Sequence, residues 1–271
     1  MSEFFTIVRE CADGQLDGVS DGIILAMCVI VGLLIIASII ALIVSIFLGI
    51  SYAKYNRKEN SCKQTGEQVA RRILDQNGLQ HIKVSKSGSI LFGNSYSHFF
   101  KKVRLRRLTW KKDSVTSLAM AAQKSSLAIL DKENDPDMKA RVRMTPLIYF
   151  GPLAFVPLII IGAVLDIIVF NTTNGSCIIV ASVIGLLFYL ISFFMSISVL
   201  KTEKKAQNKA LQIMRSSNLA TSEEIEMCRK LFRLYNIEYI NDMVIALLEL
   251  IYRVLQIIAY VQNESSSSSS N

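Results

Sequence analysis

The chain has 271 residues, a formal net charge of +8 and a pI of about 9.2. Hydrophobic residues make up 51% of it and the mean hydropathy is +0.39, values that argue against an ordinary water-soluble protein and indicate a membrane protein. A basic chain can bind nucleic acid or an anionic surface, but a protein with several spans also keeps Lys and Arg on its cytoplasmic side. We therefore expect membrane lipids, and no nucleic acid, among the partners.

The cysteines and histidines give no metal or disulfide pattern. The five cysteines contain no CxxC pair, and their number is odd. The only two histidines, His81 and His98, lie far apart and have no acidic residue close by in sequence. Both are expected to be surface or strand residues.

The first span is the clearest feature. Residues 1–21 form an acidic segment, and residues 22–50 then contain no charge, which is enough for a helix that crosses a bilayer. Residues 51–144 carry 20 Lys and Arg against 8 Asp and Glu, a net charge of +12. This asymmetry predicts an outer N-terminus and a cytoplasmic segment after the first span.

Residues 51–144 also contain signals of a small α+β fold. Thr65 and Gln68 have the spacing of a capping box at the start of a helix that Asn77–Gly78 would end. Short strands are expected at 82–84, 89–92 and 103–105, followed by a helix over 115–130 that Asp113 or Ser114 would cap.

The rest of the chain alternates between apolar and basic segments. We expect a mainly α membrane protein with about four transmembrane helices and a small cytoplasmic α+β insertion between the first two. Both termini would lie outside the cell membrane. The segments after 144 are a second span at 145–170, a third at 176–200, a cytoplasmic helical segment at 201–238, a fourth span at 239–261 and a disordered Ser-rich tail at 262–271.

The fourth predicted span has a polar face. It includes Glu249 and Arg253, which are four residues apart and can form an ion pair within the membrane. Such a pair can serve packing within a bundle or a transport pathway.

Several motifs resemble one known family. The stretches that carry the resemblance are Thr65–Leu79 (TGEQVARRILDQNGL), Ala121–Ile129 (AAQKSSLAI) and Lys205–Leu211 (KAQNKAL). They are similar to TGxEVARxILDxNGL, AAHExGHAI and DASxRAL of the bacterial membrane neutral zinc metallopeptidases, the YugP-like type. Arg141 and Pro146 fall at the family's spacing, and Leu248–Glu249–Leu250 resembles its last span.

The resemblance implies a zinc site whose residues are replaced here. In an HExxH helix, two histidines four residues apart bind Zn²⁺ and the glutamate between them is the base for the bound water. The corresponding residues are Gln123, Lys124 and Leu127. Glu203 falls where the family has a further metal ligand, so it is either a vestigial ligand or a solvated residue beside the membrane. We expect no zinc, because one carboxylate cannot hold a catalytic ion.

These residues predict a pseudoenzyme, that is, a catalytically inactive homologue that binds or regulates another membrane protein or forms a homo-oligomer. Two alternatives stay open. The chain could be a metallopeptidase with a rearranged site that uses His81 or His98, or a channel or transporter component that uses the polar face around Glu249.

Overall fold

The computed structural model describes residues 6, 8, 16, 18–88, 93–148, 150–169 and 176–269. The chain divides into two compact units, one of residues 1–40, 145–196 and 241–271 and the other of residues 41–144 and 197–240. Three helices run from one unit into the other: α2 (Asp21–Arg57), α8 (Ser176–Ser216) and α9 (Ser222–Ser269).

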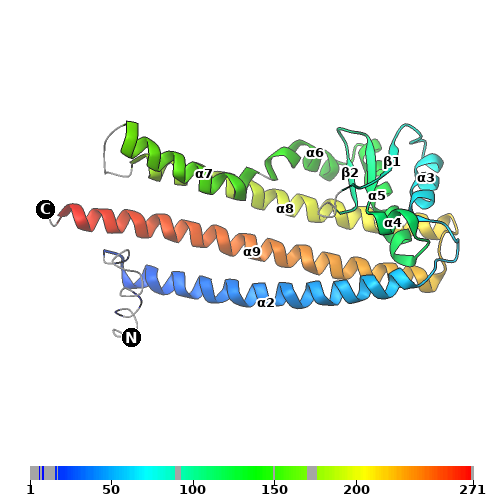
Figure 1. The fold of residues 1–271 in the computed structure, drawn as a ribbon, viewed down its shortest axis with the longest axis horizontal. Helices are drawn as coiled ribbons and strands as arrows, with labels where there is room; N and C mark the ends of the chain where they lie inside the picture. The colour runs from blue at the N-terminus through cyan, green and yellow to red at the C-terminus, as the bar shows by residue number, and fades with distance from the viewer. Residues whose placement is uncertain are drawn as a thin grey trace. The chain divides into compact units, whose positions relative to one another are not determined.

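The second unit holds a small sheet and short helices (Figure 1). Its sheet has the order β1-β3-β2, with β3 (Lys102–Leu105) parallel to β1 (Lys83–Lys86) and antiparallel to β2 (Ser95–Ser97). In the register, Val84 and Tyr96 both lie opposite Val103. The remaining elements of this unit are the helices α3 (Gly66–Gln76), α4 (Arg107–Lys111), α5 (Val115–Lys132) and most of α6 (Pro136–Ile148).

The predicted helix caps are confirmed. The Thr65 hydroxyl accepts from the Gln68 N–H and the Gln68 side chain accepts from the Thr65 N–H, which is the capping box. Ser114 caps α5 by accepting from the Ser117 N–H. Thr221 and Glu224 make the same reciprocal pair at the start of α9. Local side-chain chemistry therefore sets where these helices begin.

Helix α3 packs tightly against the rest of the unit. A Cβ on Gly66 would lie 2.1 Å from the Thr109 carbonyl oxygen, so only glycine fits at this contact. The buried faces of α3, α5, β3, α8 and α9 form one hydrophobic core, with Ile73, Leu118 and Leu231 among its fully buried members. Helix α5 is therefore enclosed on all sides by other parts of the unit.

The first unit consists of apolar helices. Three helices of the described chain are long and apolar enough to cross a membrane, namely those that begin at Asp21, Ser176 and Ser222. Most of the side chains in their apolar parts are not buried, and those of Leu33, Ile36 and Ile39 on α2 are exposed. A soluble domain does not leave so large an apolar surface in water, so these faces are suited to lipid.

The structure describes most of the second predicted span as helix. Its described residues fall on the end of α6, on α7 (Phe150–Val164) and on the π-helical turn η1 (Leu165–Val169), which follows α7 directly. Pro157 lies inside α7, where it removes a helix hydrogen bond. The structure therefore supports three spans by length, and the fourth stays a prediction.

Two further predictions concern residues 89–92 and the C-terminal tail. The strand predicted at 89–92 lies outside the described residues. The tail predicted to be disordered from residue 262 is instead helical to Ser269, because extending an existing helix costs far less than starting one.

Candidate functional site

The site is built on α5, the helix that carries the altered motif. Every residue of this helix from Val115 to Leu130 is buried, including the polar Gln123 and Lys124. Lysine is almost never fully buried unless it is paired, so a partner for Lys124 is required. Lys124 is therefore a buried cation and not a surface residue.

The partner is Glu203 on α8. Lys124 Nζ lies 2.9 Å from Glu203 Oε2, and Gln123 Nε2 donates to the same oxygen at 2.8 Å. Arg141 Nη1 of α6 lies 2.8 Å from the other oxygen, Oε1. The side chain of Glu203 is only 3% exposed, so this carboxylate is a buried centre held by three side chains and not a solvated residue.

The charges in this cluster depend on each other. Glu203 lies just beyond Leu200, where the apolar part of α8 ends. Burial raises the pKa of its carboxyl, but the cations of Lys124 and Arg141 outweigh burial and leave the pKa at about 2. Burial lowers the pKa of Lys124, and Glu203 opposes that change. Two cations thus face one anion in a nearly dry environment.

The zinc ion that the family implies does not fit these residues. Both oxygens of Glu203 are already engaged, and the Lys124 ammonium stands where a dication would have to approach the carboxylate. Leu127, four residues from Gln123, packs in an apolar cluster with Met138 and Ala206 and offers no ligand. Within the described residues, no group of three His, Cys, Asp or Glu side chains could hold a metal.

A cavity of about 420 Å³ opens beside this cluster. Gln123 and Lys124 line it together with Arg106, Tyr235 and Tyr239. Gly93 and Asn94, which lead into the strand β2, also contribute to the lining. The altered motif therefore faces a space large enough for one or two side chains of another polypeptide.

Other predicted site residues lie elsewhere. His81 and His98 line a separate cavity, where His98 Nδ1 lies 2.7 Å from the Asp131 carboxylate. On α9, Arg253 donates to Gln256 at 2.8 Å. The structure thus brings together Gln123, Lys124 and Glu203, and it places both histidines in a different site.

Sequence reasoning missed two partnerships. The sequence marks Arg141 only by its spacing, although Arg141 is the second cation on Glu203. Lys205, the residue at the family's next acidic position, forms ion pairs with Asp135 and Asp137. Neither partnership has a local signal in the sequence, because each joins α6 or the residues just before it to the distant helix α8.

The three long apolar helices define a membrane protein. Residues 30–258 match the family described as "Putative neutral zinc metallopeptidase", and the chain belongs to this family. It is also similar to the "Putative membrane protease YugP" of Bacillus subtilis (strain 168), with 25% identity over 205 residues that cover 76% of this chain and 86% of that protein. No solved structure matches the chain.

These comparisons confirm the resemblance and correct one expectation. The prediction that the chain is not an enzyme is contradicted, because both the family and the relative are named as peptidases. That prediction inferred a loss of hydrolysis from the loss of the HExxH ligands. The substitutions show only which ligands the motif position on α5 can bind. The membrane location agrees with the relative's name and with the three apolar helices.

Proposed function

We propose that this chain is a membrane-bound member of the metallopeptidase family that binds a polypeptide segment in the cavity beside α5 and holds no zinc between α5 and α8. It would act as a binding or regulatory subunit for another membrane protein. The observation that carries the proposal is the buried Lys124–Glu203–Arg141 cluster, in which internal cations occupy both oxygens of the carboxylate at the metal-ligand position.

The cavity supports polypeptide binding. Its lining is mixed, with aromatic rings from Tyr52, Tyr235 and Tyr239 and charged groups from Arg106 and Glu238. Aromatic and arginine side chains are the residues that most often anchor protein contacts. The strand β2 is at one edge of the described sheet, and an extended segment that pairs with it would pass Asn94 at the cavity.

Gly49 allows a direct test of the cavity. It lines the cavity from α2, and a Cβ added to it would meet no atom within 4 Å. A Gly49→Phe change should therefore fill the space without straining the helix. Gly32→Phe is the matched control, because Gly32 lies on the same helix, does not line the cavity and has equally open space around it.

The probe is fluorescently labelled casein, an unstructured polypeptide, added to the purified full-length protein in detergent. Anisotropy measures binding, release of labelled fragments measures hydrolysis, and elemental analysis measures zinc. We expect binding that Gly49→Phe weakens at least tenfold, that Gly32→Phe leaves intact and that a zinc chelator does not change. Equal binding by both variants would refute the binding role. One zinc per chain, or hydrolysis that the chelator stops, would refute the metal-free site.

A further inference from the structure

A second cavity, separate from the one beside α5, lies between the sheet and α6. It has a volume of about 410 Å³, and none of its lining residues belongs to the first cavity. Its lining includes four cations and one carboxylate. These are Lys101, Lys132, Lys139, Arg143 and Asp131, which give a formal charge of 4 − 1 = +3 with both histidines neutral.

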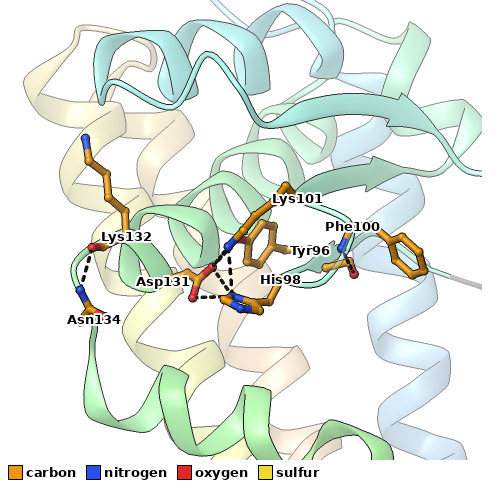
Figure 2. A network of polar contacts seen from close by, with 8 residues as sticks. Tyr96, His98, Phe100, Lys101, Asp131, Lys132 and Asn134 are labelled. Atoms are coloured by element: carbon orange, nitrogen blue, oxygen red, sulfur yellow. Dashed lines mark hydrogen bonds and ion pairs between the residues drawn. The ribbon is translucent and has the colours of Figure 1, made fainter.

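The carboxylate is already neutralised within the protein. Figure 2 shows Asp131 with three partners on the β2 strand and the turn that follows it. Tyr96 Oη donates to Asp131 at 2.6 Å, His98 Nδ1 lies 2.7 Å away and Lys101 Nζ lies 3.4 Å away. Asp131 is therefore not available to balance the cations of α6.

Lys139 and Arg143 are the two cations of α6 that line the cavity. In the part of the chain that the structure describes, neither has an acidic partner, and both are exposed. They are four residues apart on α6, a spacing at which like charges repel each other and destabilise a helix. An anion in the cavity would contact both and remove that repulsion.

The turn beside the cavity carries two exposed aromatic rings. Phe99 and Phe100 are 66% and 71% exposed, and they lie between His98 and Lys101, which line the cavity. The guanidinium of Arg104 lies over the Phe100 ring, 5.6 Å from its centre. Aromatic rings next to basic residues are typical of segments that dip into a membrane interface.

Along the chain, this cavity is next to a predicted membrane entry. Arg143 comes just before the apolar residues that begin at Pro146. Positive residues beside a span are common, but a cavity that joins them to exposed phenylalanines is an additional feature. We propose that the cavity bounded by Lys101, Lys139 and Arg143 binds the phosphate headgroup of an anionic phospholipid while Phe99 and Phe100 enter the interface. This proposal does not depend on the proposed function.

The test uses native mass spectrometry of the full-length protein in detergent with three probes: dioctanoyl phosphatidylglycerol, dioctanoyl phosphatidylcholine and glycerol phosphate. We compare the wild type with Lys139→Gln/Arg143→Gln. The matched control is Lys83→Gln/Lys111→Gln, which removes two exposed charges that do not line the cavity. Each basic residue near an anionic surface is worth about 1 kcal/mol, so the cavity variant should bind phosphatidylglycerol roughly 30-fold more weakly.

The control variant should bind phosphatidylglycerol as the wild type does, and the wild type should bind phosphatidylcholine at least tenfold more weakly. If both variants lost phosphatidylglycerol binding equally, the effect would depend on total charge alone, and the proposed site would be refuted. Glycerol phosphate that binds as tightly as the lipid would show a site for a soluble phosphate compound, which also refutes the proposal.

A second measurement tests the turn. The chain has one tryptophan, Trp110. In a Trp110→Phe/Phe100→Trp variant in lipid nanodiscs, brominated phosphatidylglycerol should quench the new tryptophan. Emission that the brominated lipid does not change would place this turn in water and overturn the proposal.

Discussion

Replacing Glu203 with glutamine tests the buried cluster most directly, because it removes one charge with almost no change in volume. Lys124, whose side chain is 8% exposed, would then be buried without a counter-charge, and the partly buried Arg141 would lose its anion. Breaking a buried ion pair by removing one partner costs about 3–5 kcal/mol. The protein can escape this only by deprotonating Lys124. From an ordinary pKa of 10.5 this costs about 5 kcal/mol at pH 7, at about 1.36 kcal/mol per pH unit.

Both routes lower the free energy of unfolding by several kcal/mol, and a thermal unfolding assay in detergent can detect this loss. At about 2–4 °C per kcal/mol, Glu203→Gln should lower the Tm by roughly 6–20 °C. Glu223→Gln is the matched control, because Glu223 pairs with Lys58 but its side chain is 73% exposed, and such pairs contribute about 1 kcal/mol or less.

Removing both charges should recover most of the loss, so Glu203→Gln/Lys124→Met should melt well above Glu203→Gln alone. If Glu203→Gln and Glu223→Gln melt together, the buried cluster does not stabilise the protein and the reasoning fails.

The other predictions concern the metal position, acid stability and a helix cap. A Gln123→His/Lys124→Glu/Leu127→His variant restores the family's donor pattern and should take up zinc in elemental analysis where the wild type does not; equal zinc contents would contradict the correspondence. The pKa of Glu203 is lowered from 4.5 to about 2, so the unfolded chain binds more protons between those values. Stability should therefore fall as the pH drops from 4.5 towards 2, and Glu203→Gln should flatten that part of a Tm-against-pH curve. Glu224, buried at the start of α9, accepts three hydrogen bonds, and Glu224→Gln should cost about 1–3 kcal/mol in the same melting assay; an unchanged Tm would count against this cap.

Sequence reasoning predicted the local features well and the long-range ones poorly. The capping box at Thr65 and the limits of α5 follow from side chains within a few residues of each other, which is why they were readable. The pairing of Lys124 with Glu203 joins residues 79 positions apart on different helices, and no periodicity encodes it. Resemblance located both positions, but only the structure shows that their charges meet.

The Lys124–Glu203 contact also has a consequence for biosynthesis. When α5 leaves the ribosome, the carboxylate that its lysine needs has not yet been made, and an apolar stretch must be synthesised and inserted in between. At roughly 5–20 residues per second, 79 residues take about 4–16 s. During that interval α5 cannot bury its ammonium group in a stable core. Completion of the core around α5 thus waits until α8 has been made.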